Sequence, residues 1–329
     1  MRILVIFTGG TIGCANKDGW IGIEGLAKYE LLERYNEQRQ NESISFDVAE
    51  PYSILSENLS AKELSALINC VSENLSVGYD GIIVTHGTDT LSYSAAALSF
   101  AFSDVEIPVL LVSANYPLSD SRSNGLYNFI GACDFIMKKA GRGVFVSYKN
   151  CNESRVNIHK GTRISTFRES SSDLYSIDDK PYAFCEDGEV FLNKDYASTQ
   201  KGESVYPLQF CENPRILLID SYPANDYSYS LDSVSCIILS PYHSATIDTG
   251  NPNLKRFCER ASERNIPVFL VNSKSGAKYE SERAISDMKI KVLPPCCKSA
   301  IYVKSWIAVS KKMDIESFLL TPVDEEFCK

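Results

Sequence analysis

Two turns, each joining an apolar run to a helical pattern, constrain the fold of this chain more than any other feature of its sequence. The strand pattern at 3–8 runs into TGGTIG at residues 8–13, and the strand pattern at 81–85 leads into HGTDT at residues 86–90. In an open parallel α/β sheet, ligands bind at the edge where strands pass into helices. Hydroxyl residues, glycines and one carboxylate at two such turns predict a polar pocket for a small substrate.

Strand and helix patterns alternate up to about residue 150. Ser60 and Glu63 form a capping-box pattern, and the apolar residues behind them recur on one helical face. Other segments follow the same order, with helices near 26–38, 91–102 and 121–139 and strands near 109–112 and 144–146. This alternation is typical of βαβ units and predicts a mainly parallel sheet.

The pattern becomes irregular from about 150 to 205, where we expect short hairpin strands and a connection between domains. A second α/β series follows, with strands near 215–220, 236–239 and 268–271, a helix near 252–264 and a helical tail with a break near Lys311 and Lys312. The charged run at 280–283 fits a solvated face. We therefore predict an α/β protein with a larger, mainly parallel domain at 1–205 and a smaller Rossmann-like domain at 213–329.

Composition excludes several classes of function. A net charge of −9 disfavours a nucleic-acid-binding protein, which would carry a basic surface. No apolar run reaches the roughly 20 residues that span a bilayer, and the first apolar run is too short for a secretory signal, so we expect a cytoplasmic protein. The 11 cysteines include no CxxC pair, and the 3 histidines are far apart. We therefore expect reduced thiols and no metal site.

Each turn alone leaves its role open. TGGTIG lacks both the GxGxxG spacing and the GK[ST] ending of nucleotide-binding loops, so it fits a simple glycine turn as well as a binding site. The hydroxyl of Thr11 becomes a nucleophile only if a base activates it. Asp89 fits a helix N-cap, and His86 fits a structural hydrogen-bonding residue.

Together the two motifs resemble the bacterial-type L-asparaginase family, especially its cytoplasmic branch. The similarity covers most of the chain and is loose in the last hundred residues; it includes the runs at 18–21, 56–58, 122–125 and 222–223. It implies hydrolysis of L-asparagine to L-aspartate and ammonia through an acyl-enzyme, without a metal or organic cofactor. It also implies a homodimer or homotetramer that takes a small amino acid substrate.

The resemblance places catalytic roles on three residues. Thr11 is the nucleophile, Thr88 helps to activate the attacking group or water, and Asp89 anchors the α-amino group of the substrate. A neutral hydroxyl needs a proton acceptor within hydrogen-bond reach to attack an amide. Backbone N–H groups of a glycine turn stabilise the oxyanion, each by roughly 3 kcal/mol.

Four further residues are expected to bind substrate. Ser56 and Glu57 hold the carboxylate and amino ends, and Gly87 belongs to the same pocket. The backbone carbonyl of Ala114 matches a position that contacts the leaving amide nitrogen.

The chain departs from the family at two positions. The lid at 14–24 carries Trp20 where the family has a tyrosine, and an indole N–H cannot accept a proton, so Trp20 is expected to act only as an apolar cover. In GTRIST, Thr166 stands where the family has a proton-accepting lysine. Lys160, Arg163 or Arg168 would supply positive charge nearby, although an arginine stays protonated and relays no proton. An alignment shifted by one turn would instead put Lys160 in the place of the family's lysine.

Two other functions stay open. One is an amidase acting on a different or modified asparagine or glutamine amide. A relative that frees ammonia for tRNA-dependent amidation carries an additional amino-terminal domain, which we do not expect here because the first strand begins at residue 2. The other is a weakly active homologue that binds an amino acid as a sensor, although binding alone would not require Thr11. The loop at 242–246 fits either an ordinary loop or a segment that closes a neighbouring subunit's site.

Overall fold

The computed structural model describes all residues except 11, 13, 18–19, 24–26, 41–42, 166–170, 273–280 and 329. It also leaves out the side chains of residues 14–17, 20–23, 27–28, 272 and 281. The chain forms two compact units, one of Met1–Tyr196 with Glu203–Leu208 and one of Ala197–Gly202 with Gln209–Lys329. No helix in the described part of the chain has the length and apolar character that a membrane crossing requires.

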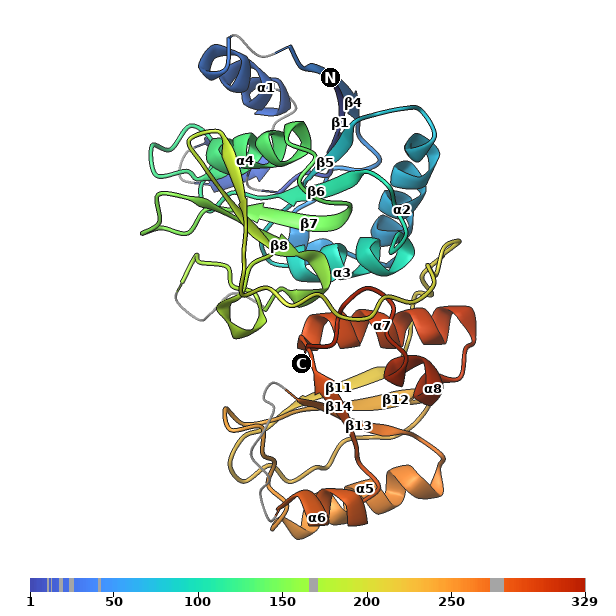
Figure 1. Ribbon diagram of the computed structural model, residues 1–329. Coiled ribbons are helices and arrows are strands. Elements are labelled where there is room, and N and C mark those ends of the chain that lie inside the picture. Colours follow the sequence, from blue (N-terminus) through green and yellow to red (C-terminus); the bar gives the residue numbers. More distant parts are fainter. Residues whose placement is uncertain are drawn as a thin grey trace. The chain divides into compact units, whose positions relative to one another are not determined.

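The first unit is built on an eight-stranded sheet (Figure 1). Its parallel part has the order β7-β6-β5-β1-β4, formed by Gly143–Tyr148, Pro108–Val112, Gly81–Thr85, Arg2–Phe7 and Ser45–Ala49. Three antiparallel strands extend it from β7, namely β8 (Val156–Lys160), β9 (Ala183–Glu186) and β10 (Glu189–Leu192). The predicted hairpin strands after residue 150 thus belong to the same sheet.

Helices cover both faces of this sheet (Figure 1). On one face, α1 (Ala27–Gln38) and α4 (Gly125–Met137) share an apolar core with alternate residues of β1, β5, β6 and β7. The other face carries α2 (Ala61–Leu75) and α3 (Leu91–Ala101). Because both faces are covered, β5 and β6 are buried along their whole length, which explains their unbroken apolar sequences.

The capping pattern at Ser60 is confirmed. The Ser60 hydroxyl accepts a hydrogen bond from the Lys62 N–H at 3.3 Å and donates to the Glu63 carboxylate, so α2 begins at Ala61. The α4 helix begins later than expected, at Gly125. Asn115 and Asn124 each accept a bond from the other's backbone N–H, at 3.0 and 2.9 Å, and this exchange holds the preceding segment in a turn.

The strand order reverses at β1. The chain passes from β1 to β4 on one side of it and then to β5 on the other. In sheets of this kind, such a reversal leaves a crevice at the carboxyl ends of the strands. TGGTIG and HGTDT follow β1 and β5, so both predicted motifs lie at this switch point.

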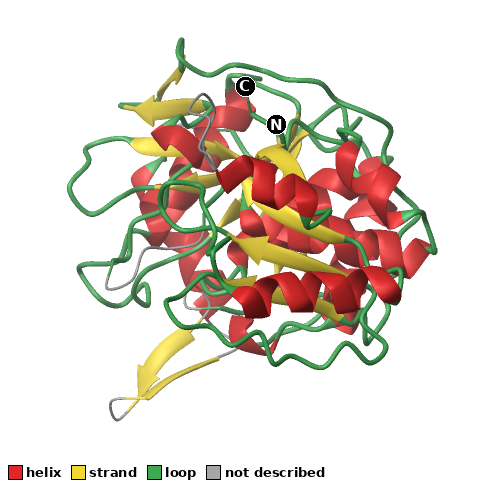
Figure 2. Ribbon diagram, turned by 90° about the horizontal axis from the view of Figure 1, so that it is seen from below, coloured by secondary structure: helices red, strands yellow, loops and turns green. Residues whose placement is uncertain are grey.

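The segment expected to act as a lid forms a two-stranded antiparallel hairpin. Strands β2 (Cys14–Lys17) and β3 (Trp20–Ile23) pair from Cys14 with Ile23 to Lys17 with Trp20. Figure 2 shows this hairpin standing out from the large sheet.

The second unit has four parallel strands in chain order, β11 (Ile216–Asp220), β12 (Cys236–Ser240), β13 (Val268–Asn272) and β14 (Lys291–Pro295). One face packs against α5 (Pro252–Glu263) and α6 (Ser281–Asp287), and α7 (Lys298–Lys311) contacts β11 and β12. The predicted break in the tail is confirmed, because Lys312 is left-handed at φ 54° and ends α7 before α8 (Ile315–Leu320).

Sequence patterns missed α6 and β14. Glu282 and Arg283 are exposed, as expected of a solvated run, but they belong to the first turns of α6. In β14 only Leu293 is buried, and two prolines end the strand, so no apolar run marks it. The predicted fold class is nevertheless confirmed: a large, mainly parallel α/β unit is followed by a smaller parallel one.

Candidate active site

The first turn of the site requires glycine at two positions. Gly9 and Gly10 have φ angles of 97° and 76°, a region that favours glycine. The N–H of Gly10 donates to the Ile54 carbonyl, and the N–H of Ile54 donates to the Thr8 carbonyl, each at 3.1 Å. A Cβ added to Gly10 would lie 2.3 Å from the backbone nitrogen of Gly87. The two motif turns are therefore in direct backbone contact.

A second link joins the strand ends themselves. The hydroxyl of Thr8 donates to the carbonyl of Thr85 at 2.6 Å, and both residues are buried. This bond ties the carboxyl end of β1 to that of β5. The two turns that follow these strands are therefore held together at their bases.

Ser56 brings a third segment to the same place. It opens the short 3-10 helix Ser56–Asn58 and is 6% exposed. Its hydroxyl donates to Oδ2 of Asp89 at 3.4 Å, and the Thr90 hydroxyl donates to its carbonyl at 2.9 Å. A Cβ on Gly87 would lie 2.3 Å from its Oγ. The predicted residues Ser56, Gly87 and Asp89 thus converge.

Asp89 is not the cap of the helix that follows. Thr90 occupies the N-cap position of α3, and the Asp89 carboxylate instead accepts the Ser56 bond. Asp89 is exposed, Thr88 is half-buried and Glu57 is exposed beside Ser56. The carboxylates of Asp89 and Glu57 therefore lie at the solvent-exposed side of this switch point. Ser56 and Thr88 lie beside them, and His86 and Gly87 are buried.

His86 supports the second turn from inside the protein. It is 2% exposed, and burial lowers the pKa of its imidazole, so the ring is neutral. Nδ1 lies 2.8 Å from the Gly87 carbonyl and Nε2 lies 2.8 Å from Oγ of Ser94. Because a carbonyl only accepts, Nδ1 carries the proton and Ser94 donates to Nε2. The structural role expected of His86 fits these bonds.

Ala114 follows β6 and is 1% exposed. A Cβ added to Gly125, the first residue of α4, would lie 2.9 Å from Cβ of Ala114 and 3.4 Å from Cγ1 of Ile12. Ala114 thus packs beside the TGGTIG run, at the carboxyl end of the strand next to β5.

Several predicted residues lie outside the described part of the chain. Thr11, Thr166 and Arg168 are not among the described residues, and of Trp20 only the backbone in β3 is described. Lys160 is 2% exposed, and its Nζ lies 5.3 Å from the ring centre of its β7 neighbour Phe145. That position is three residues, or about 10 Å, short of the carboxyl end of β7. This distance disfavours Lys160 as the missing base.

Arg163 is likewise engaged elsewhere. It is 5% exposed, and its guanidinium lies 4.7 Å from the ring centre of Tyr196. A buried arginine stacked on a ring supplies charge but accepts no proton.

Ile54 is a site residue that sequence reasoning missed. It acts only through its backbone, which bonds to both Thr8 and Gly10. A role that uses only the N–H and C=O of a loop residue leaves no signal in its side chain.

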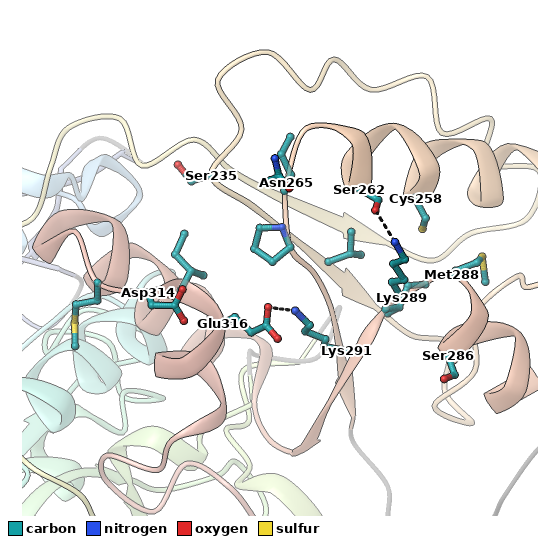
Figure 3. A pocket seen from close by; sticks show the side chains of 16 residues that line it. Ser235, Cys258, Ser262, Asn265, Ser286, Met288, Lys289, Lys291, Asp314 and Glu316 are labelled. Carbon is teal, nitrogen blue, oxygen red and sulfur yellow. Dashed lines mark hydrogen bonds and ion pairs between the residues drawn. The ribbon is translucent and has the colours of Figure 1, made fainter.

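The described residues contain no group of three or more histidine, cysteine, aspartate or glutamate side chains that would hold a metal ion. A cavity of about 820 Å³ lies in the second unit, beside the amino ends of β12, β13 and β14 (Figure 3). Its charged side chains are already engaged, Lys291 with Glu316 and Lys289 with the Ser262 hydroxyl at 3.2 Å. It contains none of the motif residues.

Curated relatives in sequence are components of an amidotransferase. The chain is 30% identical over 247 residues to a glutamyl-tRNA(Gln) amidotransferase subunit of Methanobrevibacter smithii, and 31% identical over 239 residues to the subunit of the same name from Saccharolobus solfataricus. Each match covers 69% of this chain and 52% of the relative. The chain thus spans about half the length of these curated relatives.

Solved structures share the fold. The thermostable L-asparaginase from Thermococcus kodakarensis matches with a TM-score of 0.79, over 100% of both chains. L-asparaginase I from Vibrio cholerae matches with a TM-score of 0.81, over 100% of this chain and 99% of that one. Both are 22% identical in sequence. The family model "Asparaginase, N-terminal" matches residues 2–197, more than half of the chain. This protein therefore belongs to the asparaginase family.

Proposed function

We propose that this protein is an amidohydrolase that converts L-asparagine to L-aspartate and ammonia through a threonine acyl-enzyme. The observation that carries the proposal is the meeting of Ser56, Gly87 and Asp89 at the switch point between β1 and β5. An asparaginase-family chain with a polar constellation of hydroxyls and carboxylates at that edge suits hydrolysis of a small amide.

In this proposal the hydroxyl oxygen of Thr11 attacks the side-chain amide carbon. The amide nitrogen takes the proton lost by Thr11. The tetrahedral intermediate then collapses: the C=O bond re-forms, the C–N bond breaks and ammonia leaves. Water then attacks the threonine ester, which releases aspartate and returns the proton to Thr11. Thr88 helps to activate the attacking group, and Ala114 receives the leaving nitrogen through its backbone carbonyl.

Charge at the site favours an amino acid zwitterion. Asp89 and Glu57 are both exposed near Ser56, so they suit the α-ammonium group. In the substrate complex the Ser56 hydroxyl would turn its single O–H from Asp89 to the α-carboxylate, and the positive end of the α3 dipole would also favour that anion. The hairpin at 14–24 would close over the bound substrate, with Trp20 as an apolar cover.

By the resemblance, this chain would depart from its family at the proton acceptor. Thr166 stands at the position of the family's lysine, and the placement of Lys160 beside Phe145 disfavours a substitute from that residue. We propose that Thr88 and a water molecule bound beside the substrate carry the proton lost by Thr11. This relay predicts a lower kcat than that of a family member with the lysine.

The relatives favour a second candidate. Both curated relatives are named as a subunit of a glutamyl-tRNA(Gln) amidotransferase, so this chain would release ammonia from an amide for use by a partner. Under the first candidate we expect a cytoplasmic homodimer or homotetramer; under the second, a hetero-complex.

Ammonia release by the purified protein distinguishes these functions. L-asparagine and L-glutamine are supplied separately, with Thr11→Ala prepared in parallel as the blank. Turnover of asparagine that vanishes in Thr11→Ala supports the proposal, and turnover of glutamine alone favours the amidotransferase role. Thermal stabilisation by L-aspartate without turnover of either amide would indicate a binding protein and overturn the enzyme proposal.

A further inference from the structure

The buried histidine of HGTDT has an arrangement that packing alone does not require. His86 is almost completely enclosed, yet it makes two directed hydrogen bonds, one at each ring nitrogen. The bond from Nδ1 goes to the carbonyl of the next residue, Gly87, at 2.8 Å. A neutral imidazole has one donor nitrogen, and here the Ser94 hydroxyl selects it by donating to Nε2.

This bond fixes the orientation of one peptide group. The Gly87–Thr88 peptide is planar and trans, so its C=O and N–H point in opposite directions. With the carbonyl held toward the buried ring, the N–H of Thr88 points away from the core. That direction is the open edge of the sheet, because Thr88 is half-buried and Asp89 is exposed.

The N–H of Thr88 is available to a ligand. Among the hydrogen bonds of the described residues, none has this N–H as its donor, whereas the Thr88 carbonyl accepts from the Leu91 N–H at 3.3 Å. The same turn packs against Gly10, whose Cβ would lie 2.3 Å from the Gly87 nitrogen. Gly87 also packs against Ser56, whose Oγ would lie 2.3 Å from a Cβ added to Gly87, so this donor belongs to the turn where the three segments meet.

We infer that His86 is a positioning residue that aims the Thr88 N–H at the carbonyl oxygen of the amide under attack. The inference rests on the proposed function. Held by Ser94 and aimed at Gly87, the imidazole prevents the peptide from flipping and turning its carbonyl toward the developing negative charge. Its effect is therefore on the chemical step, since the oxyanion forms only in the transition state.

Two substitutions separate the ring nitrogens. In His86→Asn the amide nitrogen takes the place of Nδ1 and still donates to the Gly87 carbonyl. In His86→Gln the amide takes the place of Nε2 and still contacts Ser94, but it leaves the carbonyl without a donor. Both remove the aromatic ring from the same buried site, so they share the packing cost.

We expect His86→Asn to keep kcat within about 10-fold of the wild type and His86→Gln to lose about 100-fold or more, with little change in KM. Ser94→Ala should fall between them, because the imidazole loses the partner that selects its tautomer. Ser92→Ala removes another buried serine of α3 and should leave kcat unchanged. Urea unfolding of each variant measures the structural cost separately.

The outcomes are distinct. Equal losses of kcat in His86→Asn and His86→Gln would overturn the positioning role, and so would losses of kcat that simply follow the losses of stability in urea. In either case, ammonia release by the wild type would still support the proposed function. If His86→Gln does not fold, Ser94→Ala against Ser92→Ala decides, and equal kcat values in that pair overturn the role. A wild type that releases no ammonia from either amide, whether or not it binds L-aspartate, would overturn both proposals.

Discussion

The hydroxyl of Ser56 lies 3.4 Å from Oδ2 of Asp89, across the contact between a 3-10 turn and the HGTDT turn. The bond leaves the other carboxylate oxygen, Oδ1, for a ligand. Glu57 is an exposed carboxylate next in sequence to Ser56. Under the proposed function, these two acidic groups are the candidates for the substrate ammonium, and the Ser56 bond orients Asp89 in the free protein.

Asp89→Asn tests which carboxylate anchors the substrate. The amide still accepts from Ser56 but lacks the charge that attracts an ammonium group. We expect kcat/KM for asparagine to fall about 100-fold or more, since a charged partner is lost at the site. Glu57→Gln is the matched control, with an expected loss of less than about 10-fold. Steady-state ammonia assays measure both, and the opposite order would assign the ammonium to Glu57.

Gly10→Ala tests the contact between the two motif turns. The added Cβ would lie 2.3 Å from the Gly87 nitrogen, so one turn must shift. Gly78 is the control, because its φ of 88° is equally unfavourable for alanine but nothing lies within 4 Å of its Cβ position. Gly78→Ala should cost about 1–2 kcal/mol from backbone strain alone. Gly10→Ala should cost about 1–3 kcal/mol more and abolish ammonia release. Equal urea midpoints in the two variants would contradict close packing of the turns.

The sequence predicts the role of a residue in this fold and site when the residue acts through its side chain, and not when it acts through its backbone. Strands β1 and β5 are predictable because burial on both faces demands unbroken apolar runs, and the two turns because hydroxyls and glycines mark them. The resemblance adds Ser56, which lies 33 residues before Asp89 and has no local pattern. Ile54 is not predictable, since only its N–H and C=O serve the turn. Strand β14 is missed because one buried leucine gives no periodicity.

A buried ion pair in the second unit gives a prediction about stability. Nζ of Lys304, on α7, donates to Oε1 of Glu326 and to the Thr321 carbonyl, each at 2.5 Å. Both charged side chains are 0% exposed. Lys304→Met leaves the Glu326 charge buried, so we expect it to reduce the free energy of unfolding by about 3–5 kcal/mol. Chemical denaturation followed by tryptophan fluorescence at Trp306 on α7 measures it.

The control for that pair lies on the same helix. Lys298 bonds to Asp220 at 2.7 Å, but both side chains are partly exposed, so Lys298→Met should cost about 1 kcal/mol or less. The double variant Lys304→Met with Glu326→Gln should recover part of the loss, because the glutamine carries no charge while its oxygen still accepts from the Val323 N–H. No recovery would mean that the packing of Lys304, rather than its charge, stabilises the segment.

Buried histidines predict how stability depends on pH. Burial lowers the pKa of His159 to about 3, and the only bond of its ring in the described part of the chain joins Nδ1 to the Ser176 hydroxyl at 2.8 Å. The unfolded chain binds a proton near pH 6.5, so this histidine causes no loss above that pH and an increasing loss as the pH falls from 6.5 towards 3. The free energy of unfolding then falls by up to about 1.4 kcal/mol per pH unit.

His159→Asn, which keeps a group near Nδ1, should therefore show a smaller fall in urea midpoint between pH 7.5 and pH 5 than the wild type. His243→Asn, at an exposed position, should match the wild type. A pH dependence unchanged in His159→Asn would show that acid unfolding is governed by other groups.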